Sequence, residues 1–188
     1  APRSRDLHAL HAGIQGELDR VVAQMSTWEP DSDISRYNRA AAGHWQPLPE
    51  DFWTVLSAAH DIARRSDGAF DPSIGPLVAL WGFGAQARAQ RVPDAAERTA
   101  VARRCGWQKL QLDQPARAAL QPGGLQLDLS AIAKGYGVDL VSHWLRRNGV
   151  EAALVEVGGE LHGYGRKPDG QPWRVLVESA PEEDAGAE

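Results

Sequence analysis

Apolar residues recur at three- and four-residue steps in several stretches of the chain, which is the spacing of one buried helix face. These stretches predict helices over residues 6–27, 50–66, 94–105 and 130–148. Asp6 is placed to cap the first helix and Pro49 sits where the first turn of the second tolerates a proline. Gly68 and Gly149 lie where they would end the second and the last.

Shorter apolar stretches between turn-forming residues predict strands. They cover residues 109–112, 118–120, 125–129, 152–157, 160–164 and 173–178. Gly123-Gly124 supplies one turn, and Gly158-Gly159 is typical of a hairpin. Residues 29–38 are polar and predict a turn. Helices that alternate with clustered antiparallel strands predict an α+β fold, with several helices packed on the strands in a single domain over residues 1–179.

Composition narrows the function classes. The chain has 188 residues, a length typical of one domain, and a formal net charge of −5 with scattered basic residues, which argues against a nucleic-acid partner. The single cysteine excludes an internal disulfide and a zinc site built from thiolates. No apolar run approaches the ~20 residues of a membrane span. The acidic tail, residues 180–188, is predicted to be disordered.

The stretch from Leu127 to Asp139 carries the most specific chemistry. A strand is predicted to end at Asp128 and a helix to begin at Ser130, and backbone N–H groups at such a junction favour an anion. Ser130 is placed to cap that helix. Lys134, one of only three lysines against seventeen arginines, opposes the helix dipole there unless an anion is bound. An exposed lysine on a helix packed through its glycines is the alternative.

The glycine- and proline-rich stretch over residues 68–84 is too apolar for a solvated loop. Its stiff turns fix Asp71, whose carboxylate could accept hydrogen bonds from a ligand's ring nitrogens or hydroxyls. An Asp-Pro turn that caps itself is the alternative. The early stretch from Asp31 to Asn38 begins like an EF-hand loop, but it lacks the glycine and the final acid, which argues against calcium.

Together, four pieces in order resemble the FAD:protein FMN transferase family, also called the ApbE family. Asp33 to Asn38 resembles its early Ser-x-x-Asn signature, and Gly68 to Leu77, with Trp81-Gly82, resembles its flavin-contacting loop. Leu127 to Asp139 resembles its Asp-Leu-x-x-x-x-Lys-Gly core. Val157 to Glu160 resembles its Gly-Gly hairpin, which Trp173-Arg174-Val175 follows. The match covers nearly the whole chain.

The resemblance implies an enzyme that moves the FMN half of FAD onto a threonine hydroxyl of an acceptor flavoprotein and releases AMP, with magnesium. By position it implies FAD contacts at Met25, Ala69, Phe70, Asp71, Asp128 and Lys134. It also implies that the backbone carbonyl of Ala131 helps to bind magnesium. Many relatives are periplasmic lipoproteins, so the resemblance implies a periplasmic location and a lipid anchor upstream of Ala1.

Relatives in this family continue beyond the equivalent of Glu188 with a segment that carries the proposed base and two further magnesium ligands. The resemblance therefore implies that the catalytic residues lie in a later segment absent from this chain. Two alternatives stay open on the sequence. One is an FAD pyrophosphatase that uses water in place of the threonine, and the other is a protein that binds FAD without catalysis.

Overall fold

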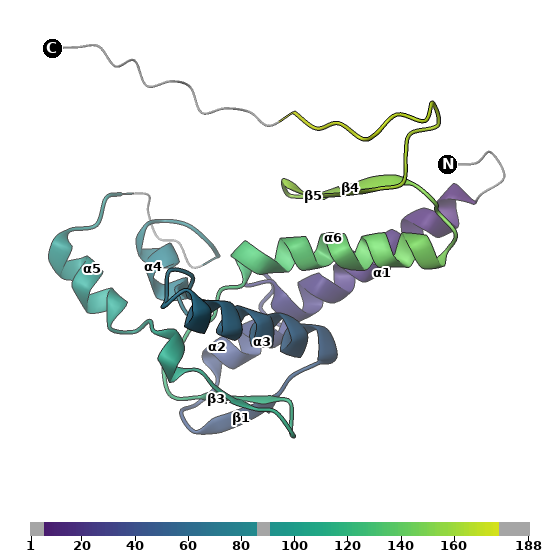
Figure 1. Ribbon diagram of the computed structural model, residues 1–188. Helices are drawn as coiled ribbons and strands as arrows, with labels where there is room; N and C mark the ends of the chain where they lie inside the picture. The colour runs from purple at the N-terminus through teal and green to yellow at the C-terminus, as the bar shows by residue number, and fades with distance from the viewer. Residues whose placement is uncertain (1–5, 86–90, 177–188) are drawn as a thin grey trace, which may run out of the picture.

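The computed structural model describes residues 6–85 and 91–176 (Figure 1). The helices are α1 (Leu7–Met25), α2 (Asp33–Arg39), α3 (Glu50–Arg65), α4 (Gly75–Leu80), α5 (Ala95–Ala102), the short 3-10 turn η1 (Trp107–Lys109) and α6 (Ser130–Arg147). The strands are β1 (His44–Pro47), β2 (Gln111–Asp113), β3 (Ala118–Gln121), β4 (Ala153–Val157) and β5 (Glu160–Tyr164). This combination confirms the predicted α+β class with antiparallel strands.

The four predicted helices correspond to α1, α3, α5 and α6. Asp6 caps α1 as expected, since its Oδ1 accepts hydrogen bonds from the N–H groups of His8 and Ala9 at 2.9 and 3.2 Å. A capping box opens α5, where Asp94 and Glu97 each accept from the other's backbone N–H. The first residues of α1 and α5 are therefore set by local side-chain chemistry.

Two helices and one strand were missed, and the turn predicted over residues 29–38 is wrong for its second half. There α2 begins after Ser32, whose hydroxyl accepts from the N–H of Ser35 at 3.2 Å. Ile34 and Tyr37, three residues apart, are fully buried on one face of this seven-residue helix. Polar residues surround these two apolar positions, so the sequence does not show a helical period over so short a segment. The other missed elements are α4 and β1.

The strands form two small antiparallel sheets at opposite ends of the molecule (Figure 1). One has the order β1-β3-β2, with Trp45 opposite Leu120 and Leu112 opposite Ala119. The other is the β4–β5 hairpin, which packs on α6. Its turn is Gly158-Gly159, as predicted, and both glycines have positive φ angles, 57° and 91°, which glycine adopts without strain.

The strand predicted over residues 125–129 is wrong, although its alternation of buried and partly exposed residues is present. Side-chain amides take the place of a neighbouring strand. The amide of Asn38 accepts from the N–H of Leu127 at 2.7 Å and donates to its C=O at 2.9 Å. Gln121, fully buried, accepts from the N–H of Leu125 and donates to its C=O. Period-two burial thus arises here without a ladder.

The strand predicted over residues 173–178 is also wrong for residues 173–176, which have no regular structure, while residues 177–178 lie outside the described part. Trp173 is nevertheless anchored, since its Nε1 donates to the C=O of Tyr164 at 2.9 Å. The predicted disordered tail, residues 180–188, and the end of the predicted domain lie outside the described residues. Within residues 6–85 and 91–176, no helix has the length and apolar character of a membrane span.

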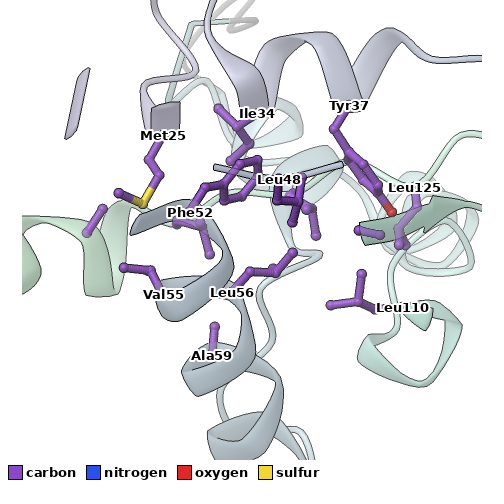
Figure 2. Close-up of a cluster of buried hydrophobic side chains, with 14 residues drawn as sticks. Met25, Ile34, Tyr37, Leu48, Phe52, Val55, Leu56, Ala59, Leu110 and Leu125 are labelled. Atoms are coloured by element: carbon purple, nitrogen blue, oxygen red, sulfur yellow. The ribbon is translucent and has the colours of Figure 1, made fainter. Parts of the chain in front are cut away.

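The larger core cluster lies where α2, α3 and the start of α6 meet the end of α1 (Figure 2). Figure 2 shows Phe52 of α3 beside Met25 and Ile34, while Leu56 of the same helix points toward Leu48. The smaller cluster joins α6 to the β4–β5 hairpin and to the first half of α1. α6 therefore belongs to both clusters, and its N-terminal turn is held between the two long helices and the hairpin.

Gly13 sets the distance between α1 and α6. A Cβ atom there would lie 1.8 Å from the ring of Trp144 on α6. Gly13→Ala is therefore expected to lower the free energy of unfolding by about 1–3 kcal/mol, the usual cost of overpacking. Urea denaturation measures it. Gly16→Ala is the matched control, because a Cβ at Gly16 meets nothing within 4 Å and alanine favours the helix. Equal effects of the two substitutions would contradict this close packing.

Candidate functional site

Three adjoining cavities of about 250, 420 and 520 Å³ form a groove around the indole of Trp28, which we call the Trp28 groove. The first and second cavities share Trp28, Phe83 and Asp128. The second and third share Trp28 and Ser130. All four segments singled out in the sequence contribute to its walls, from Ser35 and Asn38 at one end to Val157 at the other. Segments far apart in the sequence thus meet at one groove.

Asp128 and the start of α6 form the central wall of the groove. The Oδ1 atom of Asp128 accepts from the N–H of Ser130 at 2.8 Å, while its own N–H donates to the C=O of Pro72 at 2.8 Å. The sequence predicts Ser130 as the cap of α6, but Ser130 is instead the first residue of the helix. The carboxylate of Asp128 accepts the hydrogen bond from the N–H group of Ser130. Asp128 is fixed at the junction from both sides.

The first turn of α6 retains a free donor at this wall. The N–H groups of Ile132 and Ala133 donate to the C=O of Leu129 at 2.9 and 2.8 Å. Among the described residues, the N–H of Ala131 has no acceptor, and Ala131 is exposed and lines the second cavity. A free N–H at the positive end of an 18-residue helix favours a bound anion.

Lys134 joins the wall to the β4–β5 hairpin. Its Nζ donates to the C=O of Gly158 at 3.0 Å and lies 3.7 Å from Oε1 of Glu160. Both charged side chains are about half exposed, so their attraction is weak. Lys134 also lines the third cavity. The Gly158 carbonyl offsets the unfavourable position of this cation near the start of a helix, and the ammonium remains within reach of the groove.

Asp71 lines the second cavity, but both oxygens of its carboxylate already accept hydrogen bonds within the protein. Its Oδ1 accepts from the N–H and the hydroxyl of Ser73 at 2.8 and 2.7 Å, and its Oδ2 accepts from the N–H of Trp107 at 3.1 Å. Ser73 is fully buried, and its hydroxyl accepts from the N–H of Gly106 at 2.7 Å. Asp71 therefore forms the self-capping turn named above as the alternative, and also ties the loop to η1. The FAD contact expected at Asp71 stays a prediction.

Ala69 and Phe70 place the same loop in the second cavity. Ala69 is exposed, while Phe70 is partly buried and packs against the larger core cluster. The loop is held by the Asp71 and Ser73 hydrogen bonds on one side and by the Phe70 ring on the other. It therefore presents backbone groups and one aromatic ring to the groove from a fixed position.

Met25 is the predicted site residue that the structure places least favourably. Its side chain is 4% exposed and belongs to the larger core cluster (Figure 2), although Met25 is also among the residues that line the third cavity. Trp28, three residues later, is 69% exposed and lines all three cavities. Sequence reasoning did not select Trp28. Its position just beyond the end of a predicted helix was the only signal in the sequence. Tryptophan is usually well buried, so that position alone predicts a core residue.

Magnesium would have few donors here. No group of three or more His, Cys, Asp or Glu side chains suited to a metal occurs in residues 6–85 and 91–176. The groove offers the Asp128 carboxylate, whose Oδ2 accepts no hydrogen bond in the described part, and the carbonyl oxygen of Ala131. Mg²⁺ commonly binds one or two carboxylates together with waters and substrate phosphates. These donors fit a magnesium ion that is bound together with a phosphate-bearing ligand.

Comparison with known proteins agrees with the motifs. The protein-family sequence model described as "ApbE family" matches residues 3–187 of the chain. A curated FAD:protein FMN transferase of Vibrio cholerae is 37% identical over 177 residues, which span 94% of this chain and 53% of the relative. One of Klebsiella pneumoniae is 36% identical, spanning 90% of this chain and 49% of the relative. The chain thus spans about half the length of the curated relatives it matches.

Solved structures agree as well. The apo form of the Pseudomonas stutzeri flavinyl transferase ApbE superposes with a TM-score of 0.85 at 40% identity, over 94% of this chain and 58% of that one. The flavin transferase ApbE from Vibrio cholerae superposes with a TM-score of 0.88 at 36% identity, over 95% of this chain and 57% of that one. The arrangement of helices and sheets described above is therefore shared with flavin transferases.

Proposed function

The chain belongs to the ApbE family, and we propose that it binds FAD in the Trp28 groove and takes part in transfer of the FMN half to an acceptor protein. The observation that carries this proposal is the meeting of the four family-like segments at one groove. The relatives named above are transferases, which favours transfer over the hydrolysis of FAD. The same names weigh against a protein that only holds the dinucleotide.

The walls of the groove suit the parts of FAD. The rings of Phe70 and Trp28 offer apolar surface for a flat heterocycle, and aromatic side chains prefer such stacked contacts. The free N–H of Ala131 and the ammonium of Lys134 suit the pyrophosphate. Met25 and Asp71 act in this account through packing and loop position, and a direct contact of either with FAD stays a prediction.

In the proposed reaction, the oxygen of an acceptor threonine attacks the phosphorus on the FMN side of the pyrophosphate. A new P–O bond forms, the bond from that phosphorus to the bridging oxygen breaks, and AMP leaves with the bridging oxygen while the hydroxyl proton passes to a base. Asp128 and the Ala131 carbonyl would hold magnesium. When bound, the ion would neutralise the negative charge of the phosphates. The residues of this chain that line the groove would orient FAD for this attack.

Replacing Lys134 with methionine is expected to weaken FAD binding about tenfold, because a charge-assisted hydrogen bond contributes ~1.5–3 kcal/mol. Fluorescence titration with FAD measures the dissociation constant. Lys109→Met is the matched control, since Nζ of Lys109 donates to the carbonyls of Arg103 and Cys105 and does not line the groove. An unchanged titration for Lys134→Met would assign Lys134 to the hairpin contact alone.

AMP release tests the reaction itself. The protein is incubated with FAD, Mg²⁺ and a threonine-containing acceptor protein, and AMP is measured by chromatography. Transfer predicts AMP release that depends on the acceptor and stops when its threonine is replaced with valine. AMP release that is the same without any acceptor would show hydrolysis and overturn the proposal. The periplasmic location and the lipid anchor stay predictions from the family resemblance.

A further inference from the structure

A buried carboxylate that the proposed chemistry does not use joins three helices. Asp51, at the start of α3, is 9% exposed and binds side chains from α1 and α6. Its Oδ2 accepts from Nε of Arg20 at 2.6 Å and from Nε2 of Gln24 at 3.2 Å. Its Oδ1 accepts from the hydroxyl of Tyr136 at 2.6 Å. Both carboxylate oxygens are thus satisfied by side chains from other helices.

One further contact stiffens this cluster of Asp51, Arg20, Gln24 and Tyr136, which we call the Asp51 cluster. Gln24, itself 9% exposed, accepts from the N–H of Phe52 at 2.9 Å through Oε1, so it spans α1 and α3 twice. Burial and the neighbouring Asp51 carboxylate raise the pKa of the Tyr136 hydroxyl, so this hydroxyl stays protonated and donates at neutral pH. Buried polar clusters with satisfied partners fix one arrangement of the groups that they join.

Two members of the Asp51 cluster, Gln24 and Tyr136, lie close in sequence to residues that line the Trp28 groove. Gln24 precedes Met25 and lies four residues before Trp28, while Tyr136 lies two residues after Lys134. The third cavity is lined by α1 on one side and by the first half of α6 on the other. A shift of α6 along α1 would move Lys134 and the free N–H of Ala131 relative to Trp28.

We propose that Tyr136 and Asp51 are positioning residues, which hold the first half of α6 against α1 by way of α3 so that the two walls of the groove fit FAD. This inference rests on the proposed function. Neither side chain lines the second or third cavity, where the resemblance and the geometry place the flavin and the phosphates. Their effect on FAD acts through the two walls of the groove, because Tyr136 lies on the helix that carries Lys134 and Ala131, and Asp51 binds α1, which ends three residues before Trp28.

Tyr136→Phe tests the proposal, because it removes one hydroxyl and leaves the ring. FAD affinity is expected to fall about tenfold, which is the size of effect that a coupled network exerts on a distant site. Tyr164→Phe is the matched control. Its hydroxyl donates to the C=O of Val150 at 3.1 Å in the smaller core cluster, away from the groove. Each variant is titrated with FAD by fluorescence, and its free energy of unfolding is measured in urea.

The proposal predicts that Tyr136→Phe weakens FAD binding more than Tyr164→Phe does at a similar loss of stability. Asp51→Asn, which keeps the volume but loses the charge that binds Arg20, should weaken it in the same direction, and it serves if Tyr136→Phe does not fold. FAD constants equal to that of the unaltered protein in both variants would overturn this inference alone. No FAD binding by the unaltered protein would overturn the proposed function and the inference with it.

Discussion

Replacement of Asp128 by alanine is expected to lower the rate of FMN transfer by about a hundredfold or more, because one side chain performs two tasks in the groove. Its Oδ1 fixes the first residue of α6 through the N–H of Ser130. Its Oδ2 is free to bind a ligand, and among the described residues Asp128 is the one acidic residue that lines both the first and the second cavity. Single-turnover transfer to an acceptor protein, with FAD in excess, measures the rate.

Two variants separate these tasks. Asp128→Asn keeps an oxygen that can accept from Ser130 but loses the negative charge, so it should keep the stability of the protein and lose most of the transfer. Asp113→Ala is the matched control, since Asp113 makes the same kind of turn, with Oδ1 accepting from the N–H of Ala116 at 3.0 Å, outside the groove. Full transfer by Asp128→Ala would remove Asp128 from the proposed site.

Asn38→Ala is expected to lower the free energy of unfolding by about 2–4 kcal/mol. Both amide atoms of Asn38 bind the backbone of Leu127, which is 1% exposed, so the substitution leaves a donor and an acceptor unpaired in a buried place. Each such loss costs ~1–3 kcal/mol. Urea denaturation measures the change. FAD affinity should fall as well, since Leu127 precedes Asp128 and carries that wall of the groove.

The partial variant Asn38→Asp tells the two hydrogen bonds apart. It keeps an oxygen for the N–H of Leu127 but sets its second oxygen against the C=O, so its loss of stability should be larger at neutral pH than at acid pH, where a protonated carboxyl can donate to that C=O. A loss below about 0.5 kcal/mol for Asn38→Ala, the range of ordinary surface substitutions, would show that the segment from Leu125 to Leu129 is held by its apolar side chains alone.

The elements with strong local signals were predictable. The period of apolar residues gave the four longer helices, and Asp6 and the glycine pair at residues 158–159 marked a cap and a hairpin turn that the structure confirms. The structure of residues 125–129 was not predictable. Alternating burial predicts a strand whether the backbone bonds to another strand or to side-chain amides. That the partners are Asn38 and Gln121 depends on long-range contacts that no local pattern carries.

In the candidate site, too, local patterns were predictable and long-range contacts were not. The loop at residues 69–71 and the junction at Asp128 were readable, because their turn chemistry and their resemblance to a family coincide. The direction of the Asp71 carboxylate was not, since it depends on Ser73 and on the distant Trp107. Nor was Trp28, because exposure of a single tryptophan is decided by the packing of α2 and α4 around it. Chemistry could be assigned to segments, but its orientation required the fold.

The most direct test of the central claim is the intact mass of an acceptor protein with a threonine flavinylation motif, after incubation with this protein, FAD and Mg²⁺. A mass gain equal to FMN less one water is expected, located on the threonine and lost with Asp128→Ala. An acceptor of unchanged mass, with FAD bound or converted to FMN and AMP, would contradict the claim.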